Sequence, residues 1–180
     1  MSRTLKRIVS LALIYLLSVA QLCWAMMGLG VEPDEINVTN VPLGRKVAVS
    51  SLTKEPVYLQ IKNQSNMAYY YVINILHTPQ TTYPLREGFI DIPDTNWIIP
   101  EEKEVRIEAH QTKEVELYIN IPKKMGYADK KYQAIIEVKN KKNHPQDVFI
   151  LACQVRICLQ TTKKEGTLWR WLEWIKKNIW

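Results

Sequence analysis

The strongest pattern in the chain is an alternation of apolar and polar residues between Trp97 and Pro122. Val105 and Ile107 alternate with charged residues, and after a short polar link the same alternation runs from 115 to 121. A period of two indicates β-strands with one buried face and one solvated face. Because the link is short, the pattern predicts that the two segments are adjacent antiparallel strands. A strand pair cannot shield its apolar face alone, so a second sheet must cover it.

The rest of the body reads as further short strands separated by turn clusters. The segment Tyr69 to Leu76 is apolar on both faces, which predicts a central strand. Pro33 and Pro42 interrupt the first segment and predict an edge strand there, because proline cannot donate to a ladder. With no helical pattern inside this region, about seven to nine strands are expected, as in an all-β sandwich. The further strands are expected near residues 31–41, 57–61, 69–76, 132–138 and 148–159.

Several short motifs occur in a familiar order. VTNVPLG follows a Glu-Pro pair, a strand ends in NQSN, and WIIP precedes a charged strand; INIP and KYQAIIEV complete the series. This order resembles Ig-like β-sandwiches of the major sperm protein and PapD type. It is also similar to bacterial envelope domains such as the Ig-like module of WxL-interacting proteins. The resemblance covers about residues 28–160 and implies an Ig-like antiparallel sandwich, although such a fold does not by itself imply a function.

The N-terminus has the layout of a secretory signal peptide. A basic start is followed by an apolar run from 8 to 20, and small residues occupy positions 23 and 25. We therefore expect residues 1–25 to be a cleaved signal and residues 26–162 to form the exported domain. Two alternatives remain open. The uncharged run continues to about Val31, which is long enough for an uncleaved anchor, and Cys23 is a potential lipidation site with unsuitable residues before it.

The net charge of +6 lies at the two ends of the chain. Residues 1–25 hold three basic residues and no acid, and residues 163–180 hold five basic and two acidic residues. The 24 basic and 18 acidic residues of the whole chain therefore leave sixteen of each in residues 26–162. A nucleic-acid-binding domain would carry the excess charge on its folded body, so no nucleic-acid partner is expected.

Two cysteines remain after the expected cleavage, Cys153 and Cys158. Residues five apart on one strand face opposite sides, so a direct disulfide would require the strand to break between them. The alternation of the last strand predicts a buried Cys153 and a more exposed Cys158. A disulfide across a bulge, or a redox pair, remains the alternative.

Catalytic constellations are missing from the sequence. His77, His110 and His144 fall in loops or turns without metal-ligand spacing, and no Gly-x-Ser-x-Gly turn or phosphate-binding loop is present. Asp91 and Asp94 could form a carboxylate pair or bind Ca²⁺, but Asp beside Pro is more typical of a turn. The expectation is a protein without enzymatic activity, cofactor or metal.

The last eighteen residues, 163–180, contain four of the six tryptophans. In an α-helix, which turns by about 100° per residue, the apolar side chains of this tail would share one arc. Tryptophans would flank this arc, and charged residues would lie opposite it. This pattern is typical of a short amphipathic helix in the plane of a membrane surface. Docking in a partner's groove and packing on the sandwich are the alternatives. The predicted interface residues are Leu168, Trp169, Trp171, Leu172, Trp174, Ile175, Lys176, Lys177, Ile179 and Trp180.

Together these patterns favour a non-enzymatic protein-interaction or structural module of the cell envelope. It would be exported to the periplasm or another extracytoplasmic compartment and held at the membrane surface by its tail. A Pro-punctuated stretch from His77 to Asn96 is long for a loop, and such loops are usually functional. The alternative is a carbohydrate- or peptidoglycan-binding module, for which Tyr58, Tyr70 and Tyr83 would share one groove. Scattered tyrosines would favour a protein partner, and the candidate contact residues are Tyr83, Phe89, Ile90 and Trp97.

Overall fold

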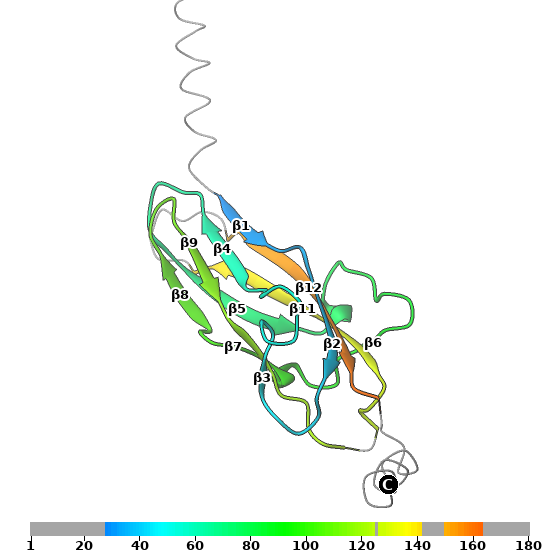
Figure 1. The fold of residues 1–180 in the computed structure, drawn as a ribbon. Helices are drawn as coiled ribbons and strands as arrows, with labels where there is room; N and C mark the ends of the chain where they lie inside the picture. The colour runs from blue at the N-terminus through cyan, green and yellow to red at the C-terminus, as the bar shows by residue number, and fades with distance from the viewer. Residues whose placement is uncertain (1–27, 125, 142–149, 164–180) are drawn as a thin grey trace, which may run out of the picture.

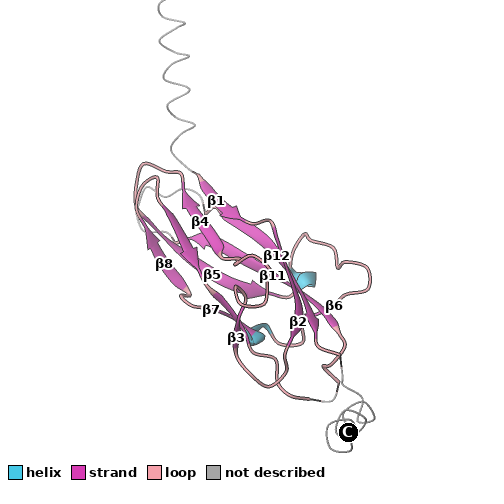
Figure 2. Cartoon of the chain, in the orientation of Figure 1, coloured by secondary structure: helices cyan, strands magenta, loops and turns pink. Residues whose placement is uncertain are grey.

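Residues 28–124, 126–141 and 150–163 are described in a computed structural model of the chain, and they form an all-β sandwich (Figures 1 and 2). The expected signal peptide and the expected helical tail lie outside the described residues. Within the described ranges, no helix has the length and apolarity needed to cross a membrane.

The described residues form twelve short strands and two 3-10 helices, more strands than the seven to nine expected. The number rises because the strands change sheets. Residues 31–41 divide into two strands, and residues 112–121 divide around Glu116. The strands are β1 (Leu29–Glu32), β2 (Glu35–Val41), β3 (Val47–Ala48), β4 (Leu59–Asn63), β5 (Tyr69–Leu76), β6 (Ile90–Asp91), β7 (Ile98–Pro100), β8 (Glu104–Ile107), β9 (Thr112–Val115), β10 (Leu117–Ile119), β11 (Lys131–Asn140) and β12 (Ala152–Thr161); the 3-10 helices are η1 (Thr78–Gln80) and η2 (Thr95–Trp97).

One sheet has six strands, in the order β2-β12-β11-β5-β8, with β6 paired to β11 beyond the end of β5. Two three-stranded sheets, β1-β4-β9 and β3-β10-β7, contribute the other side of the core. The register places Ile136 opposite Val155 on β12 and opposite Ile75 on β5. The predicted central strand Tyr69–Leu76 is confirmed, because β5 lies between β11 and β8.

The first segment is an edge strand that changes sheets at Pro33. β1 pairs antiparallel with β4, whereas β2 pairs parallel with β12 on the six-stranded sheet. Each half lies at the edge of its sheet, as the prolines predicted.

The prediction that residues 105–107 and 115–121 form adjacent strands is wrong. β8 pairs with β5, and β9 pairs with β4 in the opposite sheet, so the link at 108–111 crosses from one sheet to the other. Alternation specifies which side of a strand is buried, and two strands facing the same core from opposite sheets satisfy it equally well. The predicted burial is accordingly confirmed at Val105, Ile107, Val115, Leu117, Ile119 and Ile121.

Candidate functional site

The predicted Pro-punctuated stretch from His77 to Asn96, together with Trp97, lies against part of the outer face of the six-stranded sheet. On β11, Tyr132, Ala134 and Ile136 face the core, so Gln133 and Ile135 face outward. Both outward residues are nevertheless fully buried. The stretch is therefore a second layer on this end of the sheet; residues 77–97 are called the covering segment below.

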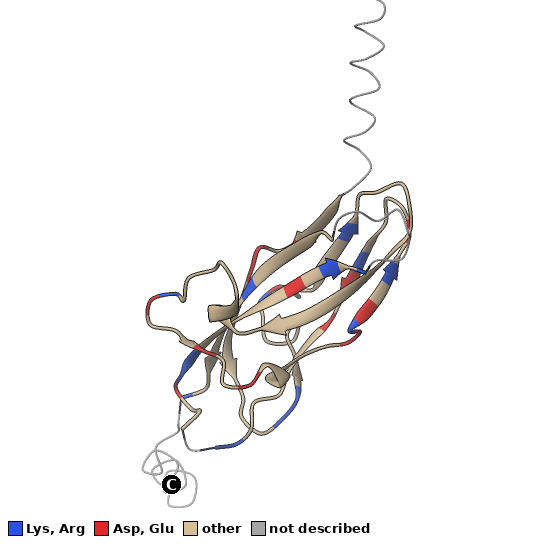
Figure 3. Cartoon of the chain, turned by 180° about the vertical axis from the view of Figure 1, so that it is seen from behind, with Lys and Arg blue, Asp and Glu red and all other residues tan. Residues whose placement is uncertain are grey.

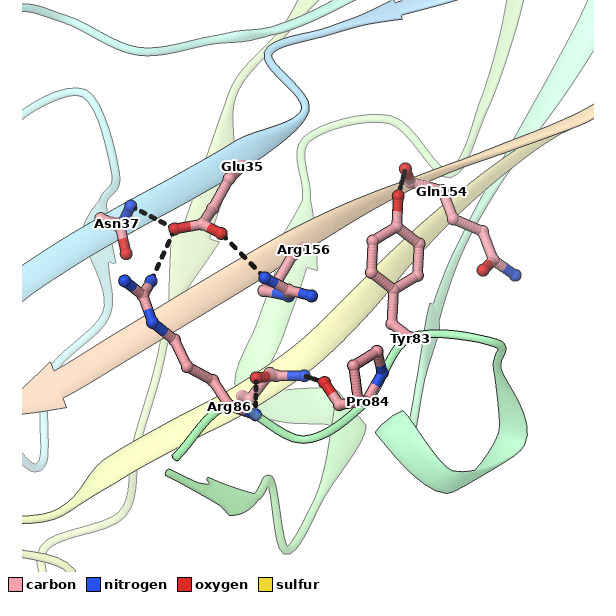
Figure 4. Close-up of polar contacts among 8 residues, drawn as sticks. Glu35, Asn37, Tyr83, Pro84, Arg86, Gln154 and Arg156 are labelled. Carbon is pink, nitrogen blue, oxygen red and sulfur yellow. Dashed lines mark hydrogen bonds and ion pairs between the residues drawn. The ribbon is translucent and has the colours of Figure 1, made fainter. Parts of the chain in front are cut away.

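A buried glutamine fixes the middle of the covering segment. The Gln133 side-chain amide donates to the Pro84 carbonyl at 3.0 Å, and its oxygen accepts from the Arg86 N–H at 2.9 Å. The Tyr83 hydroxyl donates to the Gln154 carbonyl on β12 at 3.2 Å (Figure 4). Because Gln133 is buried, leaving its amide unpaired would be costly, so these bonds favour one position of the segment.

An ion cluster joins the same segment to the sheet edge. Glu35 on β2 accepts from Arg86 at 2.8 Å and from Arg156 on β12 at 3.1 Å (Figure 4). The Asn37 amide, which donates to Glu35 at 2.7 Å, is the largest cause that holds the pKa of Glu35 below its ordinary value. The two arginines act in the same direction, and partial burial acts against them. Arg156 also lies 5.2 Å from the centre of the Tyr83 ring.

The two aspartates in this region have structural roles. Asp91 accepts from the Thr78 N–H and lies 2.7 Å from His77 Nδ1, which closes the base of the segment. Asp94 accepts from the Asn96 N–H and caps η2. Within the described residues, no group of three or more potential metal ligands converges.

The covering segment presents apolar side chains outward. Leu85 is 46% exposed and Ile90 is 48% exposed, while Phe89 is half-buried between the cations of Arg86 and Lys131. Of the residues predicted from the sequence, Tyr83, Phe89 and Ile90 lie together in this segment. Trp97, the last residue of the segment, does not share its surface: it is 4% exposed and packs edge-on against Tyr127 and Tyr132 in the core. As a surface contact, Trp97 is a wrong prediction, because its place at the entry to β7 turns the ring inward.

A cleft of about 320 Å³ opens between the covering segment and the ends of β2 and β12. Its walls carry both charges and amides, and the thiol of Cys158 lies among them. The lining residues are Asn37, Val38, Thr39, Arg86, Glu87, Phe89, Lys131, Cys158 and Gln160.

The predicted order of exposure for the two cysteines is wrong. Cys158 is only 2% exposed, although it faces outward, because Arg86 and its neighbours cover it. Cys153 faces the core side at the far end of β12 and is half-buried. Both are free thiols, and burial is the largest cause that raises the pKa of each.

The three outward tyrosines do not share a groove. Tyr58 precedes β4 in a three-stranded sheet, Tyr70 lies on β5, and Tyr83 packs under Arg156 in the covering segment. This scatter favours a protein partner over a carbohydrate, on the criterion stated from the sequence.

Sequence reasoning missed Glu35, Arg86, Gln133 and Arg156 as the residues that build this site. One signal was available. In KYQAIIEV, Ile135 is apolar at an outward position, and an apolar residue on both faces of a strand indicates that both faces are covered.

Neither a family model nor a curated protein matches the chain. Among solved structures, a PapD-like domain of human CEP192 is similar, with a TM-score of 0.50 and 9% identity, covering 78% of this chain and 89% of that domain. The E. coli chaperone DraB (TM-score 0.49, 10% identity) and a chain of the Acinetobacter baumannii CsuC–CsuE chaperone–adhesion subunit complex (0.46, 11%) are further examples. They are covered over 59% and 66% of their length, by 78% and 84% of this chain. The chain thus has an Ig-like fold of the PapD type, which agrees with the resemblance seen in the sequence.

Proposed function

We propose that the chain is a non-enzymatic protein-interaction module of the cell envelope, and that the covering segment is the surface it offers to a partner protein. The observation that carries this proposal is the pairing of exposed apolar side chains with a rigid support. Leu85 and Ile90 are about half exposed on a segment that Gln133 and Glu35 attach to the sheet and that Asp91 closes at its base.

Such an arrangement suits binding better than catalysis. A pre-ordered segment loses little conformational entropy when a partner docks, so more of the contact energy appears as affinity. Aromatic residues and arginine are enriched at protein interfaces, and the buried centre of an interface is more apolar than its rim. The charged and amide-lined cleft next to Phe89 offers the partner polar contacts that set its orientation.

The envelope location and the membrane anchor rest on the sequence pattern of the two ends. The N-terminal 25 residues favour export, and the tryptophan-rich basic tail favours a membrane surface. The domain would then present its covering segment to partners on the outer side of the cytoplasmic membrane.

Site-specific photocrosslinking in the native cells tests the partner surface. A photoreactive residue at Leu85 or Ile90 in the full chain is expected to trap one discrete protein. The same residue at Met67, which is 43% exposed elsewhere on the domain, is the matched control. Ile90→Asp is expected to abolish crosslinking from position 85 while the protein remains folded. Equal trapping from positions 67 and 85, or none from either, contradicts the proposal.

Vesicle co-sedimentation tests the anchor. The mature chain is expected to bind anionic vesicles and to dissociate partly at high salt, because each Lys or Arg near the surface contributes about 1 kcal/mol that salt screens. A chain ending at Thr162 is expected to stay in the supernatant and remain folded. Unfolding of this shorter chain would mean that the tail belongs to the core.

A further inference from the structure

One half of β5 has a free edge. On one side β5 pairs with β11 from Tyr71 to Leu76, and on the other side it pairs with β8 only from Tyr69 to Val72. The last contact on the β8 side is the Ile73 N–H, which donates to the Lys103 carbonyl at 2.9 Å. Before Lys103 the chain belongs to β7 in the opposite sheet, so among the described residues no strand continues the line of β8 beside residues 74–76.

The main-chain groups of Ile75 point out of this edge. In an extended strand, residues two apart direct their N–H and C=O to the same side, so Ile75 follows Ile73 toward the side that β8 leaves unpaired, where η2 forms the facing wall. The even-numbered residues face β11, as the bond from the Lys141 N–H to the Tyr70 carbonyl shows. Neither main-chain group of Ile75 has a hydrogen-bond partner within the part of the chain that the structure describes.

A groove of about 270 Å³ lies along this edge. Its apolar side chains come from both sides of the sandwich, and Ile98 and Pro100 of β7 are buried in its wall. Lys103 is the single charged residue of the lining, and none of the described residues forms an ion pair with it. The lining residues are Ile73, Asn74, Ile75, Leu76, Thr95, Asn96, Ile98, Pro100 and Lys103.

We infer that this groove accepts an extended segment of another protein, which adds to the edge of β5 as a short antiparallel strand. The segment would pair with the N–H and C=O of Ile75, place apolar side chains in the groove and bring an acidic side chain to Lys103. Main-chain hydrogen bonds supply affinity in such strand additions, and the pockets for alternate side chains supply specificity. The antiparallel direction follows from the neighbouring strands β8 and β11, both of which run antiparallel to β5.

The shape of the edge favours a single strand over a second copy of the domain. The free edge spans only residues 74–76, because β8 occupies the line before it and the chain turns into η1 after it. The flank of a second sandwich would meet β8 before its own strands came within hydrogen-bond distance of Ile75. A lone extended segment has no such flank. Thr95 and Asn96 at the end of the covering segment line this groove, but the exposed surface at Leu85 and Ile90 is separate from it, since neither of these two residues lines it.

Hydrogen exchange of the mature protein tests the inference directly. The Ile75 amide is expected to exchange faster than the Asn74 amide, because the Asn74 amide faces β11 and the Ile75 amide has no partner among the described residues. The probes are acetylated, amidated nonapeptides in which valine alternates with threonine, with one aspartate moved through successive positions. At least one of them is expected to slow exchange at Ile75 by tenfold or more.

Three changes establish the mode of binding. Two patterns of N-methylation are compared, one on the odd-numbered and one on the even-numbered residues of the peptide. One pattern is expected to abolish binding and the other to spare it, because only one of the two sets of peptide N–H groups faces β5. Lys103→Ala is expected to weaken binding by up to about fivefold, the size of an exposed ion pair, and to remove the preference for an aspartate position. Lys139→Ala, an exposed lysine elsewhere on the same sheet, is the matched control and is expected to leave binding unchanged.

Asn96→Trp, at the exposed rim of the groove, is expected to block every peptide without changing the core. An Ile75 amide that is already protected in the free protein overturns the inference. The inference is also overturned if no peptide slows exchange at the Ile75 amide, or if binding survives both patterns of N-methylation. None of these measurements depends on residues 85 or 90, so their outcome is independent of the covering-segment proposal.

Discussion

The outer face of the six-stranded sheet has two ends with opposite character. At the covered end, Gln133 and Ile135 of β11 and Cys158 of β12 lie beneath residues 77–97. At the bare end of the same β11, Glu137 and Lys139 face outward, and β8, on the far side of β5, carries Glu104 and Arg106. All of these side chains are on the outward side of the alternation, yet only those at the covered end are lost from solvent. Figure 3 shows acidic and basic positions along the strands of the domain.

The comparison shows that strand alternation determines direction, whereas burial depends on what lies in that direction. The residue types follow the difference: isoleucine, cysteine and a hydrogen-bonded glutamine occur at the covered end, and charged residues occur at the bare end. Polar contacts through Gln133 and Glu35 join the covering segment to the sheet above the buried Ile135, and Ile92 near the end of the segment packs in the core. Substitutions at these contacts should therefore weaken the attachment of the covering segment by different amounts.

The largest difference between the two ends is expected from removing the buried aliphatic side chain. Ile135→Ala should lower the free energy of unfolding by about 2 to 5 kcal/mol, because it leaves a cavity under the covering segment. Lys139→Ala, four residues along on the same face, should change it by no more than about 0.5 kcal/mol. Denaturant unfolding of both variants measures the difference. Equal losses would mean that the covering segment does not pack on β11.

The next effect is expected from the glutamine that holds the segment. Gln133→Ala removes the partners of the Pro84 carbonyl and the Arg86 N–H, and should cost about 1 to 3 kcal/mol. Gln154→Ala is the matched control on the neighbouring strand, because Tyr83 bonds to its main-chain carbonyl, which the substitution keeps. The control should stay within about 0.5 kcal/mol in the same unfolding experiment. A loss at Gln154 as large as at Gln133 would contradict this account.

In the native protein, the thiol beneath the covering segment should react more slowly than the other thiol. Cys153 should react with a thiol reagent faster than Cys158, on the order of tenfold, because Cys158 is exposed only when the structure opens locally. Labelling followed by mass spectrometry in native buffer measures the ratio, and both should react fully in denaturant. Gln133→Ala should accelerate Cys158 without changing Cys153. Faster native labelling of Cys158 would show that the covered end is open.

The smallest effect is the pH dependence of the ion cluster. The folded-state pKa of Glu35 lies below its ordinary value of 4.5, so its contribution to stability is present above pH 4.5 and is lost as pH falls through the lower folded-state pKa. Glu35→Gln should therefore be less stable than the wild type at neutral pH, by no more than about 1 kcal/mol because the site is partly solvated. The gap should close in acid. Thermal or denaturant unfolding from pH 7 to pH 3 measures it, and a gap that persists at pH 3 would contradict the ionic origin.

A bare-end pair provides the reference for that measurement. Glu104→Gln removes the exposed pair with Lys141, whose atoms are 3.1 Å apart. Its effect should remain within about 0.5 kcal/mol at neutral pH. If Glu104→Gln costs more than Glu35→Gln, the covered end gains nothing from its ion cluster.

The amino-acid sequence was sufficient for the inward-facing residues and for the central strand. Alternation at 105–107 and 115–121 predicted buried residues correctly, and the two-sided apolarity of Tyr69–Leu76 predicted β5 with its observed bounds. These features are local: the direction of a side chain follows from its position along an extended chain, and the apolar residue type follows from the environment it meets.

The tertiary structure alone decided which strands are neighbours and what covers them. The link after β8 crosses to the opposite sheet, Cys158 is buried from outside, and Trp97 turns into the core. The free edge of β5 likewise exists only because the chain changes sheets at Lys103. Each of these outcomes depends on pairings between segments far apart in the sequence, and a period of two has the same appearance whichever partner a strand finds.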